Sequence, residues 1–199
     1  EVFAELVDWS KERYKNTGGV IKIRLVKGAN LAMEKAEATL HGWVAAPYQS
    51  KADVDASYSR LLDTALRAEH ADAVRIGVAS HNLFHIAFAL EIAKKRKVMD
   101  QLDIEMLEGM ANPEALAIAN RKLRILLYAP VTRSDDFASA VAYLVRRLDE
   151  NTAIENYLRS SFEIADSQEI FDAQAERFLS SSTSRHEIST KSLRHKKIK

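Results

Sequence analysis

Two adjacent arginines in the run A-V-A-Y-L-V-R-R-L-D-E-N could together bind a small carboxylate. A helix would place four polar residues of this run on one face, at offsets 0, 3, 4 and 7: Tyr143, Arg146, Arg147 and Glu150. Neighbouring guanidinium groups form a fork that matches a carboxylate, and each charged hydrogen bond contributes about 1.5–3 kcal/mol. The alternative is a solvated helix side, where an Arg147–Glu150 pair contributes only about a few tenths of a kcal/mol.

A second chemical candidate lies in the β-rich run V-I-K-I-R-L-V-K, residues 20–27. Its apolar residues alternate with Lys22 and Arg24, so Arg24 should point away from the covering helices. Because a buried arginine is costly without an anion, Arg24 predicts either a ligand contact or an internal ion pair, with equal weight. Gly28 closes the run and would let the backbone approach a ligand, although a glycine there more often only makes the turn.

Two further polar groups follow predicted strands. Ser80, His81 and Asn82 form one of them, and capping of the next helix by His81 with Asn82 is favoured over ligand binding. Tyr128 ends the last predicted strand, where it could line a small-ligand pocket. From the sequence alone, packing in the core is the better interpretation of Tyr128.

Strands and helices alternate along most of the chain, which is typical of a parallel sheet in an α/β fold. We expect strands at 20–27, 73–79, 102–107 and 123–129, and helices at 1–15, 31–40, 52–69, 83–95, 113–120 and 137–150. Four strand–helix units form half of a TIM-type (β/α)8 barrel, and a small doubly wound sheet is the alternative. In a barrel, chemistry lies at the carboxyl ends of the strands. The helix at 137–150 carries both Arg146 and Arg147, and this arginine helix would therefore begin near the barrel mouth.

The alternation of predicted strands and helices stops after the arginine helix. Residues 1–151 form the barrel half, residues 152–179 a helical extension with helices at 154–162 and 168–179, and residues 180–199 a basic tail that we expect to be disordered. The last sixteen residues have a net charge of +5, which leaves about −4 for the rest of a chain whose net charge is +1. A nucleic-acid site would depend on this tail alone, and no aromatic residues accompany its charges.

Several classes of site find no support in the sequence. The chain has no cysteine, which excludes disulfides and thiolate catalysis. Its six histidines are dispersed, and His81 and His85 have no acidic third ligand on the next turn, so we expect no metal site. The sequence shows no phosphate-loop, dinucleotide or nucleophile-elbow motif and no apolar stretch long enough to cross a bilayer. Because the chain opens with Glu1-Val2-Phe3, without a charged segment followed by an apolar one, we expect no signal peptide.

Five segments carry a family resemblance: I-R-L-V-K-G-A, A-S-H-N, E-M-L-E-G-M, L-Y-A-P-V and Y-L-V-R-R-L-D-E-N. Their order over residues 20–161 and the Y-x-x-R-R-x-x-E signature resemble the proline dehydrogenase family, especially the proline-oxidising domain of bifunctional proline-utilisation enzymes. The resemblance implies a (β/α)8 barrel that binds FAD and oxidises L-proline to pyrroline-5-carboxylate by hydride transfer to the flavin. A quinone-type electron acceptor at the membrane, a cytoplasmic location with peripheral attachment to the inner face of the membrane, and an aldehyde dehydrogenase domain in the parent protein are further implications.

The same resemblance implies roles for individual residues. Arg146 and Arg147 resemble the pair that binds the proline carboxylate, and Glu150 resembles the acid that orients this pair on the flavin side. Arg24 resembles the arginine near the reactive flavin nitrogen, and with Tyr128 it is a candidate catalytic residue. Tyr128, Tyr143 and Leu107 would line the pyrrolidine pocket. The implied cofactor contacts are Arg24, Lys27, Gly28, Ala29, Lys51, Ser80, His81, Asn82 and Glu150.

The chain also departs from the family. The first four strands are absent, together with the active-site lysine and aspartate of the family. We therefore expect a C-terminal barrel half whose parent is an enzyme and which is inactive alone. A catalytically silent binding or assembly module is the alternative, because a half-barrel exposes two strand edges and an apolar lumen. Nucleic-acid binding through the tail is the least favoured hypothesis.

Overall fold

The computed structural model describes residues 2–27, 31–152 and 156–191. Four parallel strands form one sheet, in the order β1 (Ile21–Leu25), β2 (Val74–Ala79), β3 (Leu102–Leu107) and β4 (Ile125–Tyr128). A doubly wound sheet reverses its strand order at a switch point, whereas these strands follow one another in chain order. The arrangement confirms half of an α/β barrel.

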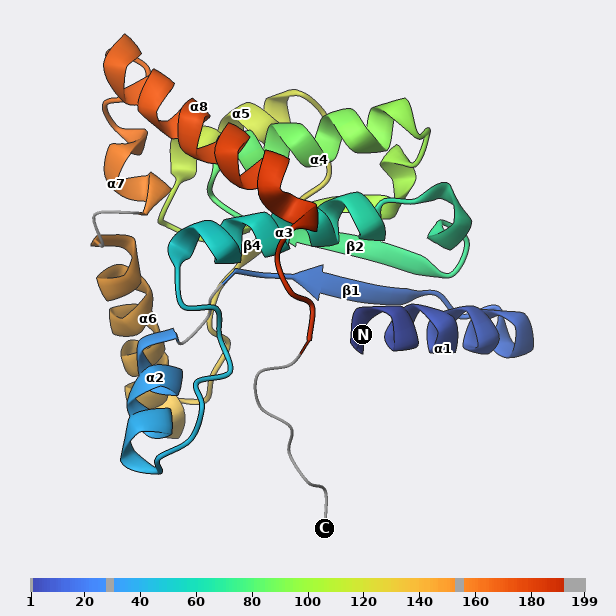
Figure 1. Cartoon of the computed structure of the whole chain (residues 1–199), viewed down its shortest axis with the longest axis horizontal. Coiled ribbons are helices and arrows are strands. Elements are labelled where there is room, and N and C mark those ends of the chain that lie inside the picture. Colours follow the sequence, from blue (N-terminus) through green and yellow to red (C-terminus); the bar gives the residue numbers. More distant parts are fainter. Residues whose placement is uncertain (1, 28–30, 153–155, 192–199) are drawn as a thin grey trace.

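Helices cover one face of this sheet and lie beyond its strand ends (Figure 1). They are α1 (Val2–Thr17), α2 (Leu31–Leu40), α3 (Lys51–Ala65), α4 (Leu83–Lys95), α5 (Asn112–Asn120), α6 (Phe137–Thr152), α7 (Tyr157–Ser161) and α8 (Gln168–Thr183). Local sequence explains several of their starts. Ser50 and Asn82 cap α3 and α4 by accepting backbone N–H groups, and Pro113 lies in the first turn of α5. None of the helices in the described part of the chain is long and apolar enough to cross a bilayer.

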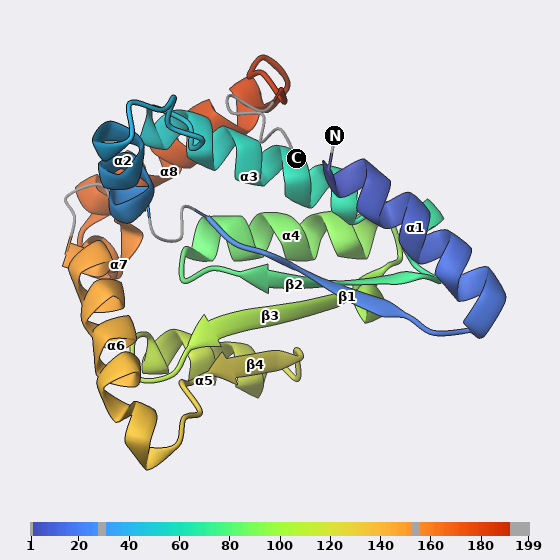
Figure 2. The same ribbon diagram turned by 90° about the horizontal axis from the view of Figure 1, so that it is seen from below.

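The hydrophobic core lies between the sheet and the helices α3, α4 and α5 (Figure 2). Ile76 and Ile104, at the centre of β2 and β3, and Leu62 of α3 are fully buried. The buried Tyr58 of α3 adds a polar link, because its hydroxyl donates to the carbonyl of Ala79 at 3.1 Å. Buried apolar residues alternate along the strands, as Ile23 and Leu25 do in β1, so one face of each strand forms the core face.

The opposite face of the sheet, which corresponds to the barrel lumen, is open. Leu126 and Tyr128 on β4 keep 44% and 45% of their surface exposed, and Val26 beyond β1 keeps 47%. Both views place α6 beyond the carboxyl ends of the strands (Figures 1 and 2). The arginine helix thus lies at the rim where barrel chemistry is expected.

The predicted element boundaries agree with the structure to within four residues. The strands predicted at 20–27 and 123–129 are shorter, Ile21–Leu25 and Ile125–Tyr128, and the helix predicted at 52–69 ends at Ala65. Of the helix predicted at 154–162 the structure describes Tyr157–Ser161, since residues 153–155 lie outside the described part. The predicted tail also begins too early, because α8 continues past Ser180 to Thr183. Buried Ser181 and Ser182 allow α8 to pack closely on α3, and residues 192–199 lie outside the described part.

Candidate functional site

A cleft of about 910 Å³ opens at the carboxyl ends of the strands. Strand ends and the helices α3, α4, α6, α7 and α8 contribute to its walls. Ten residues predicted from the sequence line it: Arg24, Lys27, Lys51, Ser80, His81, Asn82, Leu107, Tyr143, Arg146 and Arg147. Tyr128 lines a smaller neighbouring hollow of about 180 Å³, and Leu107 and Tyr143 belong to both. The structure therefore brings most of the predicted site residues together.

An ion-pair network on the lumen face holds Arg24 in place. The Nε of Arg24 donates to the Glu105 carboxylate at 2.6 Å, and Lys22 contacts the same carboxylate at 2.8 Å. The guanidinium group of Arg24 also lies 4.8 Å above the centre of the Tyr128 ring. Of the two interpretations left open by the sequence, the structure shows the internal ion pair, and it also places Arg24 against the cleft.

Glu105 can meet both cations only because β2 carries a glycine between β1 and β3. A Cβ atom on Gly77 would lie 2.3 Å from Oε1 of Glu105 and 3.1 Å from Cε of Lys22. Glu105 is only 2% exposed, so its carboxylate has little room to move. The absence of a side chain at residue 77 therefore makes the network possible.

We predict that Gly77→Ala destabilises the fold by about 1–3 kcal/mol, because the added methyl group displaces a paired, buried carboxylate. Chemical denaturation measures this change in the free energy of unfolding. A double-mutant cycle provides the control: in a Glu105→Ala background, Gly77→Ala should cost little. An equal cost in both backgrounds would contradict the proposed steric cause.

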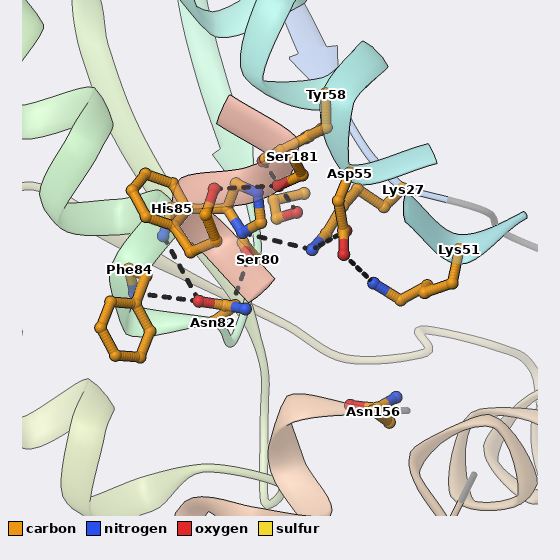
Figure 3. A network of polar contacts seen from close by, with 12 residues as sticks. Lys27, Lys51, Asp55, Tyr58, Ser80, Asn82, Phe84, His85, Asn156 and Ser181 are labelled. Atoms are coloured by element: carbon orange, nitrogen blue, oxygen red, sulfur yellow. Dashed lines mark hydrogen bonds and ion pairs between the residues drawn. The ribbon is translucent and has the colours of Figure 1, made fainter. Parts of the chain in front are cut away.

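A second polar network joins the end of β1 to α3 and α4 (Figure 3). Nζ of Lys27 donates to Asp55 at 2.9 Å and to Nδ1 of His85 at 3.3 Å, and Lys51 pairs with the other oxygen of Asp55. Burial is the main cause that lowers the pKa of Lys27, the Asp55 carboxylate partly opposes it and the Lys51 charge adds to it, and the net result is a pKa of about 8. Burial also holds the pKa of His85 well below its ordinary value, so this imidazole is neutral and Nδ1 accepts the hydrogen bond.

The residues of the segment Ser80-His81-Asn82 have roles that differ from the prediction. Asn82 alone caps α4, since its Oδ1 accepts from the N–H groups of Phe84 and His85. Nε2 of His81 instead accepts the backbone N–H of Leu107 at 3.0 Å, which leaves Nδ1 as the N–H donor. The predicted capping role of His81 is therefore wrong. Its Nδ1 is buried without a partner among the described residues and lies in a side chain that lines the cleft.

His81 should make the fold sensitive to acid. Burial lowers its pKa to about 4 in the folded chain, below the ordinary 6.5, so the unfolded chain binds more protons between these two pH values. The stabilisation is complete above pH 6.5 and is lost as the pH falls, by about 1–2 kcal/mol at pH 5. We predict that His81→Gln reduces the difference in unfolding free energy between pH 7 and pH 5. An unchanged difference would show that His81 does not cause the acid sensitivity.

The arginine pair projects from α6 to the rim of the cleft. Arg146 and Arg147 both line it, and the guanidinium group of Arg147 lies 5.5 Å from the ring centre of Tyr143. Arg24 reaches the same cleft from β1, so the three arginines predicted from the sequence all line it. Three predicted positions cannot be placed: Gly28 and Ala29 lie outside the described residues, as does the side chain of Glu150 within α6.

Sequence reasoning missed three functional candidates and one wall of the cleft. Glu105 has the same strand phase as Leu107, and Asp55 lies four residues after Lys51, so both had a periodicity signal. His85 was considered only as a metal ligand, and the described residues contain no group of three or more potential ligands. The missed wall belongs to the helical extension, whose Arg177 and Phe178 line the cleft.

A family model described as proline dehydrogenase matches residues 1–160. Proline utilization A (PutA) from Corynebacterium freiburgense is 44% identical with a TM-score of 0.81, and the match covers 97% of this chain and 18% of that protein. PutA from Bdellovibrio bacteriovorus, in a form inactivated by N-propargylglycine, is 32% identical with a TM-score of 0.76, covering 98% of this chain and 19% of that protein.

PutA from Bradyrhizobium japonicum, as the D778Y mutant, is 26% identical with a TM-score of 0.68, covering 90% of this chain and 17% of that protein. The chain therefore spans less than a fifth of each of these solved proteins. No sequence among curated proteins matches it significantly. The family model covers most of the chain and agrees with the strand order and the arginine helix, so the chain belongs to the proline dehydrogenase family.

Proposed function

We propose that the chain supplies the substrate-carboxylate clamp and part of the FAD site of an enzyme that oxidises L-proline to pyrroline-5-carboxylate. The observation that carries this proposal is the convergence of Arg24, Arg146 and Arg147 on one cleft at the carboxyl ends of parallel strands. In this arrangement Arg146 and Arg147 bind the proline carboxylate, and Tyr143, Leu107 and Tyr128 form the wall against its apolar ring. The clamp thereby orients the ring carbon that loses hydride.

The residues that β1, α3 and the segment before α4 contribute to the cleft fit an extended anionic cofactor. Lys27 and Lys51 supply positive charge, and the buried Nδ1–H of His81 is a donor without a partner among the described residues. FAD supplies the hydride acceptor when bound. Lys27, Lys51, Ser80, His81 and Asn82 would hold it, with Gly28, Ala29 and Glu150 as further contacts proposed from the family motif. Arg24, oriented by Glu105, would place a positive charge beside the reacting end of the site.

The open lumen supports a division of the site between this chain and another barrel half. We propose that the first four strand–helix units, which are absent here, complete the barrel and that this chain alone does not turn over proline. In the parent protein an aldehyde dehydrogenase domain and a quinone-type acceptor would receive the product and the electrons. These partners are suggested by the family and by the bifunctional enzymes that it includes.

The test uses this chain fused behind the first four strand–helix units of the Corynebacterium freiburgense PutA barrel. We expect the purified fusion to be yellow and to bleach when L-proline is added without oxygen. The chain alone should do neither. A folded fusion that binds no flavin would reject the proposal, whereas proline oxidation by the chain alone would reject the proposed division of the site.

A further inference from the structure

We propose that Lys27 is a covalent capture site for small aldehydes that carry an anionic group, with Lys51 as the partner of that anion. The two amines flank a single carboxylate at the wall of the cleft (Figure 3). Nζ of Lys27 lies 2.9 Å from one oxygen of Asp55, and Lys51 pairs with the other oxygen. Their ammonium groups are therefore close enough for one small ligand to reach both.

The surroundings make Lys27 the nucleophile of the pair. Its side chain is 17% exposed, against 36% for Lys51, and its Nζ lies 5.4 Å from the centre of the Tyr58 ring. Desolvation beside a second cation is a known means of activating a lysine for imine formation, because it increases the unprotonated fraction. The neutral Nδ1 of His85 accepts a hydrogen bond from the amine at 3.3 Å without adding a competing charge.

The charged and titratable groups around this amine come from three helices. Asp55, Lys51 and Tyr58 face it from α3 and His85 from α4, while Glu176 and Arg177 of α8 line the same cleft. The Asp55 carboxylate raises the pKa of Lys27 through its charge and its hydrogen bond, and so favours the protonated amine. Since Lys51 shares that carboxylate, a ligand anion that pairs with Lys51 would compete with Asp55.

The reaction is a condensation without any redox change. The unprotonated Nζ of Lys27 forms a bond to the aldehyde carbon as the C=O π bond breaks, and one proton passes from the nitrogen to the oxygen, which becomes the hydroxyl group of a carbinolamine. That hydroxyl leaves as water with a proton taken from the nitrogen, and a C=N bond to Lys27 results. The ligand anion remains beside the Lys51 ammonium group.

The natural ligand is suggested by the proposed function, on which this one step rests. Proline oxidation yields a cyclic imine, and hydrolysis of its C=N bond gives an open-chain aldehyde that retains the carboxylate. The reaction would therefore produce a member of this ligand class. Because Lys27 is also a proposed cofactor contact, we expect capture in the cofactor-free protein and protection once the site is filled.

Pyridoxal 5′-phosphate, an aldehyde with an anionic group, is the probe, and borohydride reduction fixes the imine for peptide mass spectrometry. Lys22 is the matched internal control. Burial alone would lower its pKa, but hydrogen bonds to Glu105 and Asp103 raise it above the ordinary value. At pH 7.5 we expect labelling of Lys27 to exceed that of Lys22 by about tenfold or more, because its neutral fraction is much larger. Equal labelling of the two lysines would overturn the proposal.

Two variants test the role of the Lys27 amine and the role of Lys51 as the anion partner separately. Lys27→Arg keeps the charge and should abolish the main adduct, and circular dichroism checks that the fold is retained. Lys51→Met should reduce the preference for pyridoxal 5′-phosphate over pyridoxal, which lacks the phosphate, by about tenfold. An unchanged preference would overturn the assignment of Lys51. Labelling requires no cofactor, so a labelled Lys27 in a folded fusion with the PutA barrel half that binds no flavin and never oxidises proline would reject the proposed function alone.

Discussion

Replacing either arginine of the α6 pair with alanine should lower kcat/KM for L-proline by about 10- to 100-fold in the completed barrel. Each substitution removes a charged hydrogen bond to the carboxylate, which contributes about 1.5–3 kcal/mol. Arg146→Ala and Arg147→Ala are measured in the fusion with the PutA barrel half. Because the carboxylate is bound in the ground state as well, KM should rise more than kcat falls.

A matched variant on the neighbouring helix tests whether loss of charge alone has this effect. Arg159 of α7 is exposed and does not line the cleft, so Arg159→Ala should leave KM for proline unchanged. Lysine at residue 146 or 147 should restore only part of the affinity, because an ammonium group cannot form the planar fork. A KM unaffected by Arg146→Ala and Arg147→Ala would remove the clamp from the proposed function.

Strand phase and strand order were accessible to sequence reasoning because both follow from periodicity. The alternation around Arg24 predicted its orientation correctly, and the helix offsets predicted that Arg146 and Arg147 reach the rim together. The partners of these cations were not accessible. Glu105 lies 81 residues after Arg24, and only the register of β1, β2 and β3 shows that their side chains meet above Gly77.

The role of His81 shows a different limit of the sequence. Its position before a helix favoured capping, yet the imidazole accepts a backbone N–H from the end of β3, in a strand that begins 21 residues later. Local spacing could not distinguish a cap from a contact across the sheet. The tail shows the same limit, since Arg185 pairs with Asp63 of α3 at 3.5 Å although the local composition predicted disorder.

The chain alone should self-associate, and its other barrel half should suppress that association. β1 and β4 each pair with one neighbour among the described strands, and the apolar face of α6 is open, with Val145 and Leu148 57% and 56% exposed. Unpaired parallel edges and the exposed apolar side chains of β4 and α6 favour contacts between copies. Sedimentation velocity should show a weight-average mass that rises with concentration, and a stable monomer at high concentration would contradict this expectation.

A pair of leucine substitutions identifies the lumen as the cause. Leu126 of β4 faces the lumen and is 44% exposed, whereas Leu116 of α5 is 62% exposed on a helix outside the sheet. Leu126→Lys should reduce self-association and also prevent assembly with the other barrel half, because that assembly would bury an unpaired charge. Leu116→Lys should change neither. If Leu116→Lys alone suppressed self-association, the outer helices would form the contact, and the open lumen would not be the surface through which copies of the chain associate.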